Sequence, residues 1–386
     1  MINWIKYILL VSLRKILNIF NIFPIKKNRL LFYSYNGKQY SCNPRQITEN
    51  LVQNNSQQFE IIWAFKDPKY MRNKIPSNCK AVKYRSILYY YYAKTSRIII
   101  QNVQGYGELQ RRKEQDVIQT WHASNGYKQQ GRCDGVKRKL ELLYHGDYTY
   151  VMGGSKSMIE RRVRGTMGFD GNVIPGTPRM DLIINRHEND FKEKVYSFLK
   201  VDTDEKIVLY APTWRNNRND NDYGMDYFIV KSAFEKRFGG KWTIVVRLHP
   251  NVYTPLDITE PYVKDGTKYP DIQELLCVSD ALISDYSSCV WDFSFRYKPC
   301  FLFCNDIEKY GNDRDFDIPV REWHFPMATD MVALKNVIET FDEDVFKSNI
   351  KLHHEEMGSL EDGKATDRVC ALINELCFPI EKGADA

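Results

Sequence analysis

Short apolar runs alternate with segments of helical periodicity along the chain, from residue 30 to the C-terminus. Runs such as residues 30–34, 61–65 and 97–101 have the length and composition of buried strands, and helical segments separate them. This alternation predicts an α/β protein with doubly wound parallel sheets. Further strands are predicted at residues 116–121, 148–152, 172–175, 207–211, 242–248, 281–283 and 299–303, and helices at residues 44–52, 87–94, 227–238, 272–278, 332–341, 343–355 and 366–377.

The stretch GTPRMD at residues 176–181 is helix-breaking and interrupts this series. A charged segment follows at residues 186–206 and is predicted to form a helix and connector. Because 386 residues fit two domains of typical size, we place the boundary here. The prediction is an N-terminal Rossmann-like domain at residues 30–185 and a C-terminal one at residues 186–378. Two such domains facing across a cleft form the GT-B architecture.

Residues 1–29 have a different pattern. Polar and apolar side chains fall largely on opposite halves of a helical wheel, with Asn3, Lys6, Arg14, Lys15, Asn18 and Asn21 on one half and Ile5, Leu9, Leu13, Ile16, Leu17, Phe20 and Phe23 on the other. The longest uncharged run, residues 7–13, is far shorter than the ~20 residues of a spanning helix, and charges interrupt any signal-peptide core. We expect an amphipathic helix on an anionic membrane surface, with a helix packed on the protein's own core as the alternative.

The composition narrows the classes of partner. The net charge of +6 is a mild and scattered basic excess, which suits an anionic substrate or membrane surface and does not indicate nucleic acid. The nine cysteines form neither a disulfide pattern nor a zinc motif, which is typical of a cytoplasmic protein. No flavin or nicotinamide signature is present, so no cofactor is predicted. The acidic loop at residues 220–222 is interpreted as a solvated surface loop, and the sequence gives no basis for an obligatory metal.

The most informative junction is ISDYSS at residues 283–288, where a predicted strand runs through a hydroxyl-rich turn into a helix. In open α/β sheets this is where a helix N-terminus meets a ligand, and Ser287 and Ser288 would add hydroxyl donors to form an anion cradle. The adjacent Asp285 belongs to the same turn. The simpler interpretation is that one serine merely caps the helix.

Four more stretches place candidate groups at predicted strand ends, where ligands bind in such sheets. Each alone could be a structural histidine or a weak surface ion pair. Together they predict a ligand that carries two or more phosphates. The groups are His122 followed by Lys128, Arg179 in GTPRMD, Thr213 and Arg215 in YAPTWR, and Arg247 and His249 on one side of the strand in VRLHP.

The set QTWHA, GTPRMD, YAPTWR, VRLHP and ISDYSS, in this order, resembles the CDP-glycerol glycerophosphotransferase family over roughly residues 30–377. The family includes teichoic acid primases and polymerases and related capsule enzymes. The resemblance implies a GT-B-like, peripheral membrane enzyme at the cytoplasmic face, which transfers polyol phosphate from a CDP-polyol to an undecaprenyl-diphosphate-linked acceptor and releases CMP. His122 and His249 match two functionally critical histidines, and Ser287 and Ser288 match a pair that holds donor phosphates.

One departure concerns the acceptor side. Many relatives read WHGTPLK, whereas this chain reads WHASNGYK, which moves Lys128 one position further from the histidine. The resulting hypothesis makes His122 the base for the acceptor hydroxyl, places Lys128 near the acceptor and His249 near the donor, and assigns the donor phosphates to Ser287, Ser288, Asp285, Arg247, Thr213, Arg215 and Arg179.

Three alternatives stay open. The first concerns enzymes of the same family. The polyol can be glycerol or ribitol, and the compact chain favours a primase without excluding a polymerase. The second is a nucleotide-sugar glycosyltransferase or 2-epimerase of the same fold, which would release a nucleoside diphosphate. The third is a non-catalytic, membrane-bound scaffold that binds nucleotide.

Overall fold

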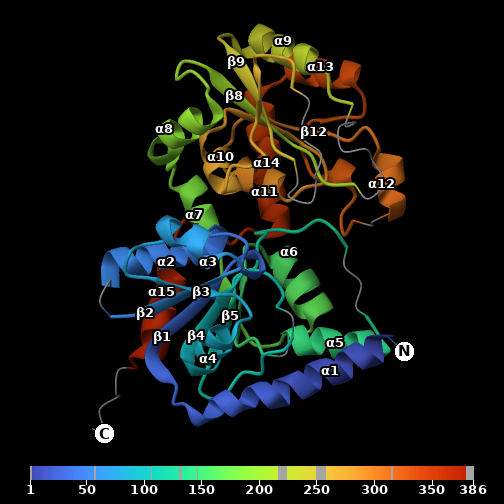
Figure 1. Cartoon of the computed structure of the whole chain (residues 1–386). Coiled ribbons are helices and arrows are strands. Elements are labelled where there is room, and N and C mark those ends of the chain that lie inside the picture. Colours follow the sequence, from blue (N-terminus) through green and yellow to red (C-terminus); the bar gives the residue numbers. More distant parts are fainter. Residues whose placement is uncertain are drawn as a thin grey trace, which may run out of the picture. The chain divides into compact units, whose positions relative to one another are not determined.

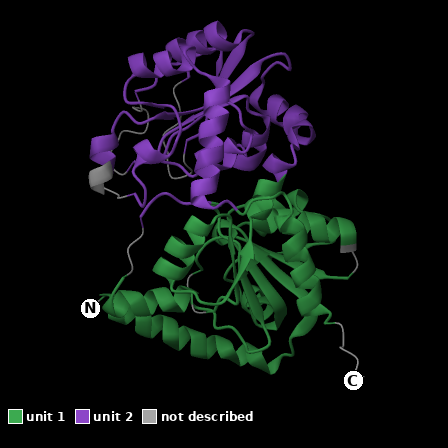
Figure 2. Cartoon of the chain, turned by 180° about the vertical axis from the view of Figure 1, so that it is seen from behind, with its two compact units in different colours: residues 1–124, 130–181, 360–386 green, residues 125–129, 182–359 purple. Residues whose placement is uncertain are grey.

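The computed structural model describes residues 2–55, 58–105, 107–129, 133–145, 147–215, 224–248, 258–313 and 316–379 (Figure 1). Two compact units are distinguished in Figure 2: unit 1 consists of residues 1–124, 130–181 and 360–386, and unit 2 of residues 125–129 and 182–359. Each contains one parallel sheet, as the alternating pattern predicts. The division differs from the predicted one, because residues 360–386 belong to unit 1 and residues 125–129 to unit 2.

Unit 1 is built on a seven-stranded parallel sheet of order β3-β2-β1-β4-β5-β6-β7. Its strands are β1 (Lys26–Tyr33), β2 (Glu60–Phe65), β3 (Lys80–Lys83), β4 (Ser96–Gln101), β5 (Asp116–Gln119), β6 (Tyr150–Gly153) and β7 (Asn172–Pro175). Its helical segments are α1 (Ile2–Leu17), η1 (Asn18–Ile22), η2 (Tyr35–Gly37), α2 (Cys42–Asn55), α3 (Pro68–Met71), η3 (Arg72–Lys74), α4 (Ile87–Thr95), α5 (Gly135–His145), α6 (Lys156–Met158), the π-helical η4 (Ile159–Met167) and α15 (Ala365–Cys377).

Both faces of this sheet are covered, which explains why its strands are apolar at successive positions. Leu30 and Phe32 of β1 join a core with side chains from α2 and α15, such as Ile47 and Val369. Leu31, between them, points to the opposite core, where α4 packs. Helix α15 belongs to unit 1 because its apolar face completes the core over β1. No local sequence pattern indicates this placement.

Unit 2 is built on a six-stranded parallel sheet of order β10-β9-β8-β11-β12-β13. Its strands are β8 (Lys206–Ala211), β9 (Trp242–Val246), β10 (Val263–Asp265), β11 (Ala281–Ser284), β12 (Cys300–Phe303) and β13 (Met327–Ala328). Its helices are α8 (Glu188–Leu199), α9 (Tyr227–Phe238), α10 (Ile272–Val278), α11 (Cys289–Ser294), α12 (Ile307–Asp313), η5 (Val320–Glu322), α13 (Met331–Glu339) and α14 (Glu343–Met357).

The chain passes between the units through α7 (Pro178–Ile184), where the sequence predicted a helix break. That prediction is wrong in detail, because the helix starts at this proline. Pro178 occupies the first helical position, where its missing N–H is not needed and its fixed φ is already helical.

Helix α1 packs on unit 1 through a polar side chain. Arg14 donates from Nε to the carbonyl oxygen of Gly107 at 2.6 Å, and it also bonds the carbonyl of Leu143 and the carboxylate of Asp147. Helices α1 and α5 lie side by side in both views (Figures 1 and 2). Large apolar side chains of α1 and η1 remain exposed, namely Ile2, Trp4, Ile5, Ile8, Leu9, Ile16, Ile19 and Ile22. Among the described helices, none combines the length and the apolar character that crossing a membrane requires.

Candidate functional site

His122 lies in a strained turn just beyond β5. Trp121, directly before it, has a φ of 53°, in the left-handed region that non-glycine residues rarely adopt. Asn43 of α2 holds this turn, because its side-chain amide donates to the carbonyl oxygens of Thr120 and Trp121, both at 2.9 Å. A buried neighbour thus fixes the unusual backbone conformation of Trp121, as is common at functional sites.

The His122 ring has a defined tautomer. Its Nδ1 lies 2.9 Å from the carbonyl oxygen of Asn102, and since a carbonyl can only accept, Nδ1 carries the proton. Nε2 is then left with a lone pair. Burial, together with the positive charges of Arg179 and Arg162, lowers the pKa of His122 to about 4, against the opposing effect of the Asn102 carbonyl. The ring is neutral at physiological pH and able to accept a proton at Nε2.

Glu361 connects the segment after this turn to the segment after β7. Its carboxylate accepts hydrogen bonds from Ser124 Oγ at 2.5 Å and from Thr177 Oγ1 at 2.7 Å. A Cβ at Gly154 would meet this carboxylate at 2.3 Å, so only glycine fits beside it. Burial raises the pKa of Glu361 to about 7. Glu361, Asn43 and Asn102 were not predicted as site residues, because nothing in their local sequence sets them apart.

Arg179, predicted to bind the donor phosphates, lies in unit 1. Its side chain is buried, and its backbone N–H donates to Asn43 Oδ1 at 2.9 Å. Its charge contributes to the low pKa of His122. Arg179 therefore shares the electrostatic environment of the histidine.

Thr213 and Arg215 of unit 2 both bind Asp285. The Asp285 carboxylate accepts from the backbone N–H of Thr213 at 2.9 Å and from its hydroxyl at 2.5 Å. Arg215 donates to Asp285 at 2.8 Å and, through Nε, to Asp306 at 2.8 Å. All three charged side chains are nearly buried, and the pKa of Arg215 is raised by its bonds to the two carboxylates, against the effect of burial. Asp306 belongs to this network although its local sequence does not single it out.

Aromatic rings flank the same network. Tyr286 and Tyr310 stack with ring centroids 4.1 Å apart, and the Arg215 guanidinium lies over both rings at 4.9 and 4.5 Å. The Lys128 ammonium lies 5.4 Å from the Tyr310 ring, and Lys128 pairs with Phe316 in an isolated antiparallel bridge. Lys128, predicted on the acceptor side within the N-terminal domain, thus belongs to unit 2.

The two serines of the ISDYSS turn differ. Ser287 Oγ accepts a hydrogen bond from the backbone N–H of Cys289 at 3.3 Å, so it acts partly as a cap. Ser288 precedes α11 and its side chain makes no capping hydrogen bond. Both are partly exposed. Arg247 donates to the carbonyl oxygens of Gly266 and Tyr269 at 2.9 and 2.7 Å. His249 lies outside the described residues.

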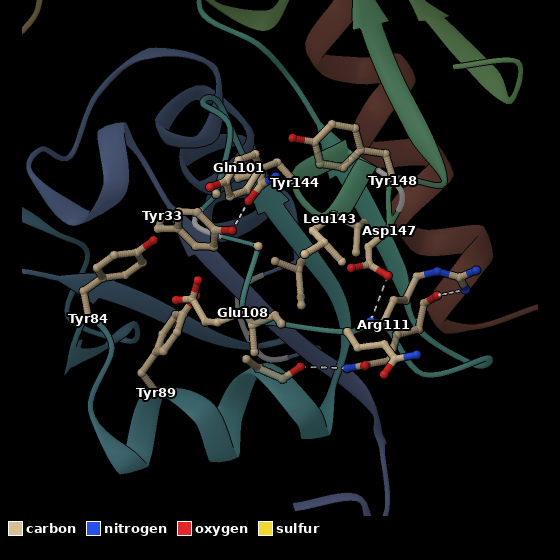
Figure 3. A pocket seen from close by; sticks show the side chains of 18 residues that line it. Tyr33, Tyr84, Tyr89, Gln101, Glu108, Arg111, Leu143, Tyr144, Asp147 and Tyr148 are labelled. Atoms are coloured by element: carbon tan, nitrogen blue, oxygen red, sulfur yellow. Dashed lines mark hydrogen bonds between the residues drawn. The ribbon is translucent and has the colours of Figure 1, made fainter. Parts of the chain in front are cut away.

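A small cavity of about 50 Å³ lies elsewhere in unit 1 (Figure 3). Tyr33, Tyr84, Tyr89 and Glu108 line one part of it, and the Tyr33 hydroxyl points to Gln101. No candidate residue from the sequence analysis lines this cavity, so we do not assign the predicted chemistry to it.

Two doubly wound parallel sheets define a protein of the GT-B-like α/β class. A solved structure of the wall teichoic acid polymerase TagF matches with a TM-score of 0.80 and 25% identity, covering 97% of this chain and 95% of that chain. A histidine-to-asparagine variant of TagF soaked with CDPG matches with a TM-score of 0.82 and 23% identity, over 97% and 98% of the two chains.

The chain belongs to the CDP-glycerol:poly(glycerophosphate) glycerophosphotransferase family, whose model matches residues 16–375. It is 27% identical to a teichoic acid poly(glycerol phosphate) polymerase of Staphylococcus epidermidis, over 91% of this chain and 51% of that protein. It is 26% identical to a teichoic acid glycerol-phosphate transferase of Staphylococcus aureus, over 90% of this chain and 93% of that protein. The chain thus spans about half the length of the polymerase and most of the length of the transferase.

Proposed function

We propose that this protein transfers glycerol phosphate, or a related polyol phosphate, from a CDP-polyol to a lipid-linked acceptor during teichoic acid synthesis, with release of CMP. The observation that carries the proposal is the family match over residues 16–375 together with a neutral His122 whose Nε2 lone pair is left available. The relatives named for glycerol-phosphate transfer and polymerisation, and the TagF structure soaked with CDPG, support the donor class.

In the proposed reaction the acceptor hydroxyl attacks the phosphorus that bears the polyol. A new P–O bond forms to the acceptor oxygen, and the P–O bond to the CMP phosphate breaks. His122 Nε2 takes the hydroxyl proton, while Asn102 holds Nδ1–H and so keeps the ring in the tautomer that accepts it. Because phosphoryl transfer depends on positioning and charge stabilisation, no covalent enzyme intermediate is needed.

The donor phosphates would bind at the strand ends of unit 2. Ser287 and Ser288 are partly exposed at the start of α11, and the Ser288 hydroxyl is not used as a cap. Arg215 is held by Asp285 and Asp306, so its net contribution to an anion site is reduced by two carboxylates. We therefore assign Arg215, Thr213 and Asp285 chiefly to shaping the turn, with Arg247 and His249 as the remaining donor-side candidates.

Membrane attachment through α1 and η1 completes the proposal. Their exposed apolar side chains include Ile2, Leu9, Ile16 and Ile22, with exposed fractions from 63% to 81%. The side chain of Arg14 lies on the packed side of the helix, where it makes a hydrogen bond to Gly107 and an ion pair with Asp147. A helix with an outward apolar face and nearby Lys26 and Lys27 is suited to lie in the interface of an anionic bilayer, on the cytoplasmic side where the donor is available.

The test is a reconstituted transfer assay. The purified protein is incubated with CDP-glycerol or CDP-ribitol and an undecaprenyl-diphosphate-linked disaccharide, and CMP is measured by a coupled assay. Acceptor-dependent CMP release supports the proposal and identifies the polyol. Release of a nucleoside diphosphate from a nucleotide sugar would instead indicate a glycosyltransferase or epimerase, and nucleotide binding without any turnover would indicate a scaffold.

A further inference from the structure

Three potential metal ligands meet in unit 2, and none of them is a residue of the proposed reaction. His324, His353 and Glu356 each bring one ligand atom to within 4.8 Å of the other two, and this is the sole such group among the described residues. His353 and Glu356 are three positions apart on α14 and so share a helix face. His324 follows η5, 29 residues before His353, so the sequence alone does not bring the three together.

The buried member of the group has an unused ring nitrogen. His353 is fully buried, and its Nε2 lies 2.8 Å from the hydroxyl of Tyr127. Its Nδ1 has no hydrogen-bond partner among the described residues. Buried polar atoms without partners are rare in native proteins and call for an explanation such as an ion.

His324 is held in a strained conformation. Its φ of 62° is left-handed, which is uncommon for a residue with a side chain, and its Nε2 lies 2.8 Å from Glu356 Oε2. Such strain persists where the surroundings fix a functional geometry. The His324 and Glu356 side chains are 26% and 46% exposed, so an ion can reach the group from solvent.

We propose that His324, His353 and Glu356 bind a divalent transition-metal ion of the zinc class. Two imidazoles and one carboxylate are a ligand set that suits zinc and its neighbours, whereas magnesium and calcium prefer oxygen ligands. Ligand atoms around a tetrahedral zinc lie about 3.4 Å apart, so the partly exposed Glu356 carboxylate has only a short distance to move. Water would complete the coordination.

Tyr127 gives the site a structural role. Its hydroxyl, by accepting the Nε2–H of His353, leaves the Nδ1 lone pair for the ion, as outer-shell partners of metal-binding histidines do. Its ring stacks on Trp323 at 3.8 Å, next to the ligand His324. Tyr127 directly precedes Lys128 in the segment 125–129, so the ion would fix the part of that segment from which Lys128 projects. The three ligands themselves take no part in the proposed transfer reaction.

The experiment measures zinc binding by the full chain. Protein stripped with a chelator is titrated with Zn²⁺ in competition with a chromophoric chelator. We expect one zinc per chain, at least 100-fold weaker binding in Glu356→Ala and His324→Asn, and 10–100-fold weaker binding in Tyr127→Phe. Glu356 is half-exposed, and asparagine tolerates the left-handed φ, so both ligand variants should stay folded.

Two controls make the outcome decisive. His187→Ala removes an exposed histidine that pairs with Asp190 and should leave zinc affinity unchanged. Co²⁺ in place of Zn²⁺ should give d–d bands without a thiolate charge-transfer band. A thiolate band, which would place the ion on a cysteine, overturns the proposal. So does equal affinity in wild type and Glu356→Ala, or a wild type that takes up no zinc.

Discussion

Thr177 donates two hydrogen bonds to Glu361, although 184 residues separate them in the chain. The backbone N–H of Thr177 donates to Oε2 at 3.0 Å, and its hydroxyl donates to Oε1 at 2.7 Å. Since Ser124 donates to the same carboxylate, Glu361 ties the segment after His122 to the end of β7. We regard Glu361 as a positioning residue for the histidine turn.

Glu361→Gln should change the pH dependence of stability. The pKa of Glu361 is raised from 4.5 to about 7 in the folded chain, so the folded state keeps a proton that the unfolded state releases. Its stabilising contribution is full below pH 4.5 and is lost as the pH rises through 7. Glutamine does not ionise, so the variant does not lose stability in this way as the pH rises. Its free energy of unfolding should therefore rise relative to that of wild type between pH 5 and 8, by up to about 3 kcal/mol.

Urea unfolding across this pH range measures the difference. Glu308→Gln, at an exposed position, is the matched control and should follow the wild-type profile. A Glu361→Gln profile parallel to that of wild type would show that the folded state does not retain the proton.

His122→Ala should lower turnover by ~100-fold or more and leave donor affinity nearly unchanged, because it removes a base without removing a donor contact. In the wild type, the acidic limb of kcat/KM should lie near pH 4, where the free His122 titrates, and not near neutrality. The variant should lose this limb. His249→Ala should instead reduce both turnover and donor affinity.

CMP release and calorimetric titration with CDP-glycerol distinguish these effects. His187→Ala, an exposed histidine, serves as the control. Near-normal turnover in His122→Ala would remove the base from the mechanism, and a donor-binding defect in that variant alone would exchange the two roles.

The two serines can be separated by single substitutions. Ser287→Ala removes a hydrogen bond to Cys289 N–H and should cost about 1 kcal/mol of stability, as other lost caps do. Ser288→Ala removes no cap and should leave the melting temperature unchanged while it weakens binding of CDP-glycerol. Thermal unfolding and calorimetry measure both quantities. If Ser288→Ala binds the donor as wild type does, its hydroxyl has no part in the phosphate site.

Leu9→Glu with Ile16→Glu should abolish liposome binding without unfolding the protein, because both side chains are exposed in the folded chain. Burial of each in a bilayer contributes roughly 1.5 kcal/mol or more, so losing both should weaken binding at least ~100-fold. Co-sedimentation with vesicles of increasing anionic lipid content is the measurement. The variant Ile87→Glu with Val332→Glu replaces two apolar residues elsewhere that are even more exposed, and it should bind as wild type does. Binding that survives the α1 substitutions would contradict the membrane proposal.

Arg215→Met should destabilise unit 2 by about 3–5 kcal/mol, because it leaves the buried carboxylates of Asp285 and Asp306 without their partner. Arg321→Met, at an exposed position, should change stability by less than about 0.5 kcal/mol. Urea unfolding compares the two. A small effect of Arg215→Met would mean that the network tolerates the loss, for example by protonation of one carboxylate.

The periodicity of the sequence determined both sheets and most of their helices, because a strand buried on both faces must be apolar at nearly every position. The strands that escaped prediction among the described residues are β3, β10 and β13, and all three lie at sheet edges. These strands are short and only partly buried; β3, for example, has one buried residue among its four, so it lacks the apolar run that reveals a central strand.

The sequence also supplied the motifs that carry the family resemblance, since the residues of each motif are neighbours in the chain. Only the tertiary structure decided which distant side chains and carbonyl groups contact the motif residues. Asn102 and Glu361 set the tautomer and the surroundings of His122, and Asp306 partners Arg215. Tyr127, in turn, bonds His353 on α14. Such partners come from distant segments because hydrogen bonding and burial act through space, and no spacing along the chain encodes which side chains the packing of a sheet will bring together.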